Sequence, residues 1–302
     1  MKPLLVRLPN HLGDACMALP ALDLLADHGF TLTLAGRPWA TDLFAAYPWK
    51  VISFATSRIQ ALRDARVDDG LLLTNSFSTA LEFRLAGISA VGYARDARSW
   101  LLHKAVAVNH RDHMVEYYHR LARVIVSAST EVPPDLRLRI SDLALRHAHQ
   151  LLAAHEIAPG YVVLCPVAVG FHHGKVKAWS GFTQLNTELL AEGVQVVAMP
   201  GPNESETVRQ ALPGAILLPE SDVASFAAVL ASARLVVAND SGSGHLAAAA
   251  GARLISVFGV TDPEKTRPWS TRATLVGSSN GWPSYKEVRS AVESALRDSA
   301  LA

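Results

Sequence analysis

The sequence lacks an excess of charge, a cysteine framework and long apolar runs, and each absence excludes a class of protein. The 302 residues hold 28 Lys and Arg against 27 Asp and Glu, a net charge of +1, whereas nucleic-acid-binding proteins usually show a much stronger basic excess. The two cysteines, Cys16 and Cys165, are too far apart to predict a disulfide framework or a pair of metal ligands. No apolar run reaches the roughly 18 residues of a membrane-spanning helix, and Arg7 and Pro9 interrupt the first run too early for a signal peptide. We therefore expect a soluble, cytoplasmic protein that does not bind nucleic acid.

The apolar content and the length predict two folded domains. Half of the residues are apolar (50%), and a domain holds about 150 residues. Short apolar runs bounded by Gly, Pro or Asn alternate with helix-like segments, which predicts βαβ units and mainly parallel sheets. Pro20 lies inside the helix-like segment 17–26 and predicts a kink or a late helix start. The predicted strands are residues 4–8, 30–35, 51–54, 70–74, 161–165, 194–199, 215–218, 235–238 and 254–258.

The same alternation predicts where the domains begin and end. The strongest linker signal is the Pro-rich segment 131–135, EVPPD, and a helix-like run follows it. Because the strand–helix alternation then starts again, we expect an α/β protein with Rossmann-like domains at 1–155 and 156–302. The amphipathic last helix, residues 285–296, could pack back on the first domain.

The most informative stretch is Asn-Asp-Ser-Gly-Ser-Gly-His at residues 239–245, between a predicted strand and an alanine-rich helix. The first N–H groups of such a helix lack intrahelical partners, and together with the helix dipole they favour an anion, typically phosphate. Ser241 and His245 can add side-chain donors. The alternative is a tight turn in which Asp240 or Ser241 is an ordinary helix N-cap.

Two other patterns in this half have weaker support. Gly242-x-Gly244-x-x-Ala247 followed by Asp262 fits a loose dinucleotide fingerprint, but the predicted helix has only about two turns and Asp262 lies beyond the next strand. Residues 277–281, GSSNG, fit the G-x-S-x-G elbow of hydrolases, but no histidine follows them, so the order Ser…Asp…His is impossible. A nicotinamide enzyme and a hydrolase of this type are both disfavoured.

Asp14 is the first candidate catalytic residue. It lies in the loop after the first predicted strand, and in open α/β sheets this position overhangs the carboxyl end of the strand, where ligands bind. A carboxylate there could act as a general base. The alternative, that Asp14 caps the following helix, is equally consistent with the sequence.

Further candidates follow strands of the second half. Lys177 lies in a long loop after residues 161–165, where a lysine could neutralise the charge that builds on a leaving group; alternatively it is a solvated lysine beside a packed Trp179. Glu204 and Glu206 follow residues 194–199 and could bond a ribose hydroxyl, or simply occupy the first turn of a helix.

Basic residues of the first half could line one wall of a cleft and attract a phosphorylated ligand, or they could be scattered and solvated. They are Arg84, Arg95, Arg98, Lys104, Arg111, Arg120 and Arg123. The histidines at 103, 110, 113 and 119 lack a ligand pattern, so no metal site is predicted. No D-x-D spacing occurs either, which disfavours a sugar transferase that uses that motif to hold a metal.

Together these motifs resemble glycosyltransferase family 9, the heptosyltransferases of lipopolysaccharide core assembly, and the Asn-Ser-Phe segment most resembles the heptosyltransferase II branch. The resemblance covers most of the chain. Its carriers are residues 7–22 (RLPNHLGDACMALPAL), 75–98 (NSFSTALEFRLAGISAVGYARDAR), 113–118 (HMVEYY), 175–182 (KVKAWSGF), 199–206 (MPGPNESE) and 239–269, which begins with NDSGSGHLAAAAG.

The resemblance implies a role for each matching residue. Asp14 would be the general base that deprotonates the acceptor hydroxyl, and Lys177 would stabilise the diphosphate leaving group. The ribose-binding glutamate best matches Glu206, with Glu204 as second choice. The remaining donor-binding residues would be Gly13, Asp240, Ser241, Gly242 and His245. The acceptor-binding residues would be Asn75, Ser76, Arg95 and Arg98.

The resemblance also implies a GT-B fold, with two parallel sheets facing a central cleft, and an inverting reaction without a metal or a cofactor. The donor would be ADP-L-glycero-β-D-manno-heptose, and the acceptor would be the lipopolysaccharide core. We expect transient, peripheral contact with the inner face of the inner membrane. Residues 1–150 carry a charge of +3 and residues 151–302 carry −2, which fits a first half that meets an anionic acceptor. Because Lys-Ala-Trp-Ser at 177–180 departs from the commoner Lys-Arg-Trp-Pro, a nucleotide-sugar-binding protein or an epimerase without transferase activity stays open.

Overall fold

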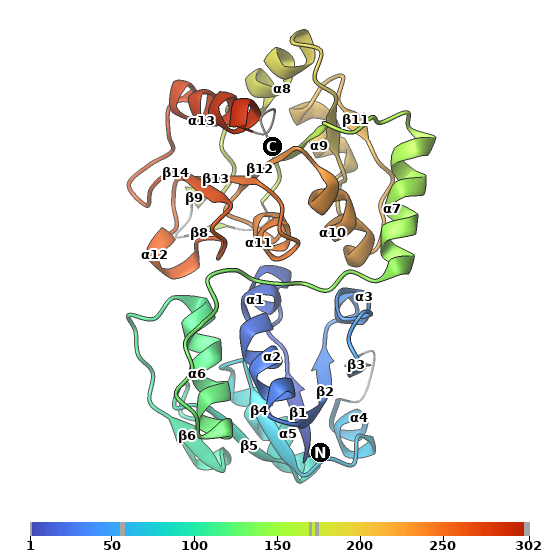
Figure 1. The fold of residues 1–302 in the computed structure, drawn as a ribbon. Coiled ribbons are helices and arrows are strands. Elements are labelled where there is room, and N and C mark those ends of the chain that lie inside the picture. The colour runs from blue at the N-terminus through green and yellow to red at the C-terminus, as the bar shows by residue number, and fades with distance from the viewer. Residues whose placement is uncertain (1, 55–57, 169–170, 173–174, 299–302) are drawn as a thin grey trace. The chain divides into compact units, whose positions relative to one another are not determined.

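The computed structural model describes residues 2–54, 58–168, 171–172 and 175–298, and the chain forms two compact units, Met1–Pro133 and Pro134–Ala302 (Figure 1). Their border lies inside the predicted linker 131–135 and earlier than the domain limit that we expected after residue 155. The reason is helix α7 (Asp142–Ala154), which packs on α10 (Val223–Ser232). A hydrogen bond of 2.9 Å between His147 Nδ1 and Ser225 Oγ joins the two helices. The helix before residue 155 therefore belongs to the second unit.

The first unit is built on a parallel sheet, and the described strands have the order β3-β2-β1-β4-β5-β6. This is the usual Rossmann order, in which the order of the strands along the sheet reverses between β1 and β4. The strands are β1 (Lys2–Arg7), β2 (Phe30–Gly36), β3 (Lys50–Ser53), β4 (Asp69–Leu72), β5 (Ser89–Tyr93) and β6 (Lys104–Val106). Helices flank the sheet: α1 (Leu12–Met17), α2 (Leu19–Asp27), α3 (Trp39–Leu43), α4 (Arg58–Asp64), α5 (Phe77–Ala86), α6 (Met114–Val126) and the 3₁₀ helix η1 (Ser99–Leu101).

Proline breaks the first helical segment as the sequence predicts. Helix α1 ends at Met17, Ala18 serves both helices as a cap, and α2 begins at Leu19 with Pro20 in its first turn. Proline is tolerated there because the first N–H groups of a helix have no intrahelical partner. Because of this break, Asp14 lies in a short helix that ends at Met17.

The second unit repeats the same strand order. Its described strands run β11-β10-β7-β12-β13-β14, all in parallel pairs. They are β7 (Val162–Cys165), β10 (Val196–Ala198), β11 (Ile216–Leu217), β12 (Leu235–Asn239), β13 (Leu254–Phe258) and β14 (Ala273–Gly277). A separate two-stranded antiparallel sheet comprises β8 (Phe171–His172) and β9 (Lys175–Val176). Besides α7 and α10, the helices are α8 (Phe182–Ala191), α9 (Ser205–Ala211), α11 (Gly242–Ala249), α12 (Pro263–Thr266) and α13 (Tyr285–Asp298).

Burial explains why the central strands are easy to recognise in the sequence. Strands β7, β12 and β13 are buried along their whole length, as expected for parallel strands covered on both faces. The expected strand 254–258 coincides with β13. The sequence analysis did not find β5, β6 and β14, and each of them has at least one exposed position.

The last helix packs on the second unit, which decides against the possibility that it packs back on the first domain. Val288 and Val292 of α13 are buried in the apolar core under the β7–β12–β13 sheet. Arg253 donates to the Ala295 carbonyl at 2.8 Å, and Arg234 donates to the carbonyl of Leu296. Side chains from the amino ends of β12 and β13 thus satisfy the last carbonyls of α13.

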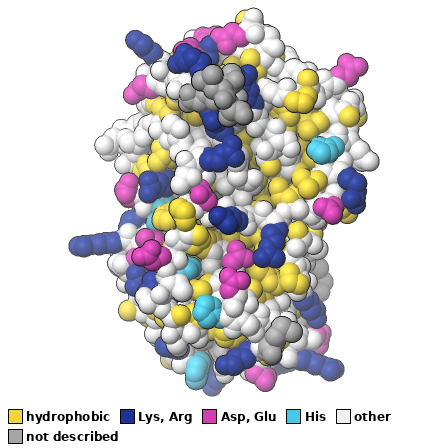
Figure 2. Space-filling view, in the orientation of Figure 1, with side chains coloured by type: hydrophobic (Ala, Val, Ile, Leu, Met, Phe, Trp, Pro, Cys, Tyr) yellow, Lys and Arg dark blue, Asp and Glu magenta, His cyan; other side chains and the backbone are white. Residues whose placement is uncertain are grey.

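The surface carries no broad field of one charge sign on the face that Figure 2 shows. Lys and Arg side chains are interspersed there with Asp and Glu, in agreement with the net charge of +1. Within the described ranges, no helix is both long and apolar enough to cross a membrane.

Candidate functional site

In each unit the candidate residues follow the two neighbouring strands between which the strand order reverses. In the second unit Lys177 follows β7, and Asp240 follows β12, the neighbouring strand. In the first unit Asp14 follows β1, and Asn75 follows β4, again the neighbouring strand. Ligands of open α/β sheets bind beyond the carboxyl ends of such strands.

Asp240 is the centre of the group in the second unit. Its side chain is 7% exposed and lies 3.7 Å from Lys177 Nζ and 3.8 Å from His245 Nε2. The Thr261 hydroxyl donates to Asp240 Oδ2 at 2.5 Å. A buried carboxylate requires such partners. The structure thus brings together three residues that the sequence singled out separately, and adds Thr261, which the sequence analysis missed.

The N-terminus of α11 carries no side-chain cap. Ser241 is its N-cap residue, but its side chain makes no capping hydrogen bond, and Ser241 Oγ is buried without a hydrogen-bond partner. By contrast, α5, α7 and α10 are capped by Ser76, Ser141 and Asp222. Ser241 therefore occupies the N-cap position without an ordinary capping hydrogen bond, and Asp240 is not the N-cap residue. A helix end whose N–H groups lack such an acceptor, beside a buried hydroxyl, has the donors that an anionic ligand needs.

Asn239 fixes the loop that carries Lys177. Its side chain is completely buried; Oδ1 accepts from the Trp179 backbone N–H at 2.9 Å, and Nδ2 donates to the Pro166 carbonyl at 2.7 Å. Asn239 thus joins the end of β12 to the end of β7 and to the segment after Lys177. This role could not be predicted from the sequence, because the partners are backbone groups of remote segments.

We expect Asn239→Ala to be strongly destabilised. The substitution leaves the Trp179 N–H and the Pro166 carbonyl buried without partners, at a cost of about 1–3 kcal/mol each. In a protein of this size each kcal/mol lowers the melting temperature by about 2–4 °C, which calorimetry measures. The matched control is Asn280→Ala, because Asn280 is exposed. Equal melting temperatures for the two variants would contradict the assignment.

The two glutamate candidates lie in different surroundings. Glu206 is exposed and engaged with Arg209 at 3.0 Å and with Gln210 at 2.8 Å. Glu204 turns back to accept from the Gly201 N–H at 3.0 Å. The charge of Glu204 acts on Cys165, the last residue of β7. Burial raises the pKa of the Cys165 thiol to about 12, the negative charge of Glu204 also raises it, and a hydrogen bond from Ser243 of α11 lowers it. Glu204, the second choice from the sequence, is therefore the one near the end of β7 and the start of α11.

In the first unit, Arg7 holds the loop that leads to Asp14. Its guanidinium donates to the carbonyls of Leu8 at 2.6 Å and Ala35 at 3.3 Å, and to Asn10 Oδ1 at 2.7 Å. Burial lowers the pKa of Arg7 to about 10, so it stays charged at neutral pH. Asp14 follows in the first turn of α1, behind the N-cap residue His11, and is partly exposed. Asp14 therefore does not cap this helix, and its carboxylate lies near the positive end of the helix dipole.

Tyr118 of α6 contacts Asp14 from the side of the core. The Tyr118 hydroxyl is hydrogen-bonded to the Asp14 side chain. Burial raises the pKa of Tyr118 well above its usual range, and the Asp14 charge acts in the same direction. Tyr118 therefore keeps its proton and donates it in the hydrogen bond to the carboxylate.

We expect Tyr118→Phe to shift the acidic limb of the pH–rate profile to higher pH. Without this donor the carboxylate form of Asp14 is less stable, so Asp14 takes up a proton more easily. A hydrogen bond to a charged group corresponds to a shift of about one pH unit. The control is Tyr161→Phe, whose hydroxyl donates to the Val229 carbonyl at 2.6 Å and which should leave the limb unchanged. An unshifted limb in Tyr118→Phe would show that the contact does not act on Asp14.

A second group in this unit surrounds Asn75. Its Oδ1 accepts from the Tyr117 hydroxyl at 3.0 Å and from Arg98 at 3.4 Å, and Arg95 is hydrogen-bonded to the same Tyr117 hydroxyl. Tyr117 and Tyr118 are adjacent on α6, so one helix contacts both Asn75 and Asp14.

Arg98 and Ser76 have structural partners. Arg98 has no exposed surface and donates to the carbonyls of Tyr93 at 3.1 Å and Thr74 at 2.6 Å. Arg98 holds the loops together, and its buried guanidinium is not presented to a substrate. This corrects our expectation that Arg98 binds the acceptor substrate. Ser76 caps α5, whereas Arg95 is exposed.

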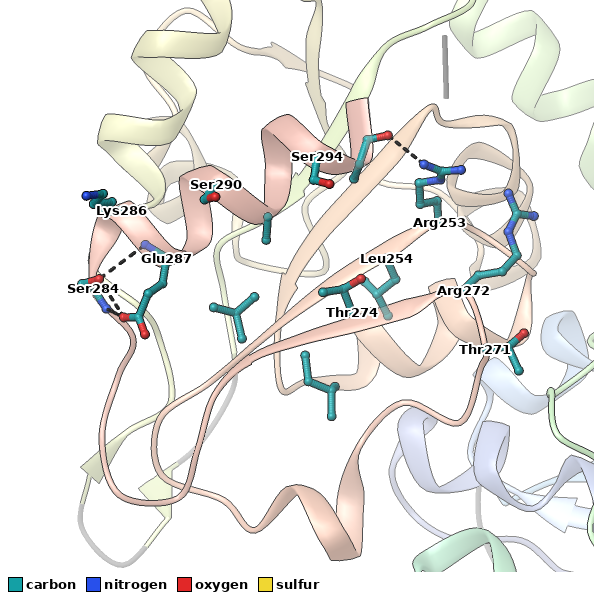
Figure 3. Close-up of a pocket in the computed structure, with 14 residues that line it drawn as sticks. Arg253, Leu254, Thr271, Arg272, Thr274, Ser284, Lys286, Glu287, Ser290 and Ser294 are labelled. Atoms are coloured by element: carbon teal, nitrogen blue, oxygen red, sulfur yellow. Dashed lines mark hydrogen bonds between the residues drawn. The ribbon is translucent and has the colours of Figure 1, made fainter. Parts of the chain in front are cut away.

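A groove of about 890 Å³ lies elsewhere in the second unit, between β14 and α13 (Figure 3). It includes Arg253 and Arg272, and none of its lining residues belongs to the group around Asp240. Over the described part of the chain, no group of three or more His, Cys, Asp or Glu side chains is placed to hold a metal ion.

The fold defines a class of protein, because solved structures with the GT-B fold match this chain over nearly its whole length. The structure of E. coli ADP-heptose LPS heptosyltransferase II superposes with a TM-score of 0.83 at 22% identity over 99% of both chains. The E. coli heptosyltransferase WaaC with ADP matches with a TM-score of 0.75 at 21% identity, over 98% of this chain and 100% of the other.

The sequence comparisons give the family. The sequence model of glycosyltransferase family 9 (heptosyltransferase) matches residues 55–295. Lipopolysaccharide heptosyltransferase 2 of Salmonella typhimurium is 28% identical over 251 residues, which cover 76% of this chain and 69% of the relative. The chain belongs to glycosyltransferase family 9, and it is a glycosyltransferase.

Proposed function

We propose that the protein transfers a heptose from ADP-L-glycero-β-D-manno-heptose to a lipopolysaccharide core acceptor, with inversion at the anomeric carbon and without a metal. The observation that carries the proposal is the uncapped start of α11 with Ser241, beside Asp240, Lys177 and His245. Family membership supports the class of reaction, and relatives named as heptosyltransferase 2 support the sugar and the acceptor.

The second unit would bind the donor. The N–H groups at Gly242 and the Ser241 hydroxyl would meet the diphosphate, and Lys177 would neutralise the charge that develops on it. Asp240 and His245 would contact sugar hydroxyls, and Glu204 would reach the ribose. Lys177 now pairs with Asp240 at 3.7 Å, so the bound diphosphate would compete for the same ammonium group.

The first unit would bind the acceptor and activate it. Asp14 takes the proton from the acceptor hydroxyl, whose oxygen forms the new bond to the anomeric carbon while the bond to the ADP oxygen breaks. Attack opposite the leaving group gives inversion. Gly13, a proposed donor contact, directly precedes the base in the first turn of α1, and Asn75, Ser76 and Arg95 would orient the acceptor.

The decisive experiment is turnover with defined substrates. We expect ADP release and a heptosylated product only when ADP-heptose and a heptose-deficient lipopolysaccharide core are both present. NMR of the product should show the α-linkage, and activity should survive a chelator. An epimer or free sugar formed without acceptor would indicate an epimerase, and donor binding without turnover would indicate a binding protein; either outcome would overturn the proposal.

The proposed substrates also set the place of action. Nucleotide sugars are made in the cytoplasm, and the acceptor is anchored in a membrane. We therefore propose that the protein acts in the cytoplasm, in peripheral contact with the inner face of the inner membrane.

A further inference from the structure

Exposed apolar side chains concentrate on one side of the first unit. Four large apolar side chains are exposed in the part of the chain that the structure describes. Three of them lie on α5 and η1: Phe77 (39% exposed), Leu85 (50%) and Trp100 (73%). The fourth, Leu143, lies on α7 in the second unit.

Together with the half-buried Leu81, which also packs against the core of the first unit, Phe77, Leu85 and Trp100 make up a surface that we call the apolar face. The rings of Phe77 and Trp100 are 6.0 Å apart. Phe77, Leu81 and Leu85 are spaced four residues apart on α5, so they lie on one side of the helix.

Helix α5 has a second apolar side that faces the core. Ala80 is 1% exposed and Phe83 is fully buried in the core of the first unit. A helix with apolar residues on both sides is typical of a helix covered on both sides, yet one side of α5 faces solvent.

Two exposed arginines lie beside the apolar face. Arg84 lies on the same side of α5 as Phe77, and Arg63 donates to the Leu85 carbonyl at 2.8 Å. Glu82 is only 17% exposed and pairs with Arg58 at 3.2 Å. The other charged residues on α4 and beside η1 are exposed: Asp64, Arg95, Asp96 and Lys104.

The apolar face adjoins the proposed acceptor site. Phe77 begins α5 directly after Asn75 and Ser76, and η1 follows Arg95 and Arg98. A protein that glycosylates a membrane-anchored acceptor has to bring these loops close to the lipid headgroups.

We propose that the apolar face docks on an anionic lipid bilayer. Trp100 and Phe77 enter the headgroup boundary, where aromatic side chains are favoured. Arg63 and Arg84 pack their methylene stems along the apolar face and present their guanidinium groups to anionic headgroups. This inference rests on the proposed function for the membrane-anchored acceptor, while the surface itself is given by the structure.

The test is sedimentation of the full chain with vesicles of phosphatidylcholine, with or without phosphatidylglycerol and without any acceptor. We expect binding to the anionic vesicles that weakens with salt. The double variant Phe77→Ser/Trp100→Ser should bind the vesicles at least about tenfold more weakly, because it lacks the two aromatic rings that would move from water into the bilayer. Arg63→Glu/Arg84→Glu should bind less well and lose salt dependence.

The matched control is Leu143→Ser, which removes an equally exposed apolar side chain from the second unit. Melting curves check that every variant folds. Unchanged binding in the double variant, or an equal loss in Leu143→Ser, overturns the proposal. Binding only when the vesicles contain the acceptor also overturns it, because the apolar face would then bind the acceptor and not the bilayer.

Activity separates this inference from the proposed function. The double variant should transfer heptose to a delipidated core oligosaccharide at the wild-type rate, but more slowly to an acceptor held in vesicles. Failure of the wild-type protein to transfer to either acceptor would refute the proposed function, while the sedimentation experiment would still decide on the apolar face.

Discussion

Replacing Asp14 by Asn should lower the rate of transfer by about 10²–10⁴-fold, the usual contribution of a general base. The amide is close in size to the carboxylate but cannot accept the proton of the acceptor hydroxyl. Because most of the proposed donor contacts lie in the second unit, with Gly13 as the exception, ADP-heptose should bind the variant almost as well as the wild type. Steady-state rates and calorimetric titration of the donor measure the two effects separately.

The control for Asp14→Asn is Asp42→Asn. Asp42 is also partly exposed and lies in the first turn of a helix in the same unit, α3. Both substitutions remove a negative charge near the positive end of a helix dipole, a loss of about 0.3–1 kcal/mol. Only Asp14→Asn should abolish transfer. A variant at residue 14 that keeps most of its activity would remove Asp14 from the mechanism.

Much of the architecture was predictable from apolar periodicity and turn residues. Strand β13 coincides with the expected range 254–258, and Pro20 marks the break between α1 and α2. Strand β5 was missed because Ser89 and Gly92 interrupt its apolar pattern. The domain limit was placed too late because a helix pattern does not tell which core the helix covers, and α7 covers α10.

The candidate site was predictable where a motif places a residue at a strand end. Asp14, Lys177 and Asp240 all stand at such positions, and the structure brings the last two within 3.7 Å. The supporting residues were not predictable. Asn239 acts through backbone groups of remote segments, and Tyr118 reaches Asp14 from a helix that is far away in the sequence.

Burial also changes what a matching residue can do. Arg98 is part of a family-like segment, but burial and backbone partners occupy its guanidinium. By resemblance, Glu206 is the better match to the ribose-binding glutamate. Its carboxylate, however, is exposed and accepts hydrogen bonds from Arg209 and Gln210 of the same helix. A match by position identifies the segment, and the packing then shows which of its side chains are already engaged by other groups of the protein.

Replacing Lys177 by Ala should lower the turnover number by about 10²–10³-fold, the effect of removing one group that stabilises charge in a transition state. The diphosphate gains negative charge only as its bond to the anomeric carbon breaks, so the loss should fall on turnover more than on the Michaelis constant for the donor. Steady-state kinetics with varied ADP-heptose measures this difference, and Lys286→Ala is the control, since Lys286 is an exposed lysine outside the Asp240 group. Lys177→Arg should recover part of the rate, because the positive charge is kept near the same carboxylate. A rise in the Michaelis constant alone, with turnover unchanged, would contradict this role. Lys177 would then bind the donor equally in the ground state and in the transition state. The N–H groups at the start of α11 would have to stabilise the charge on the leaving group instead.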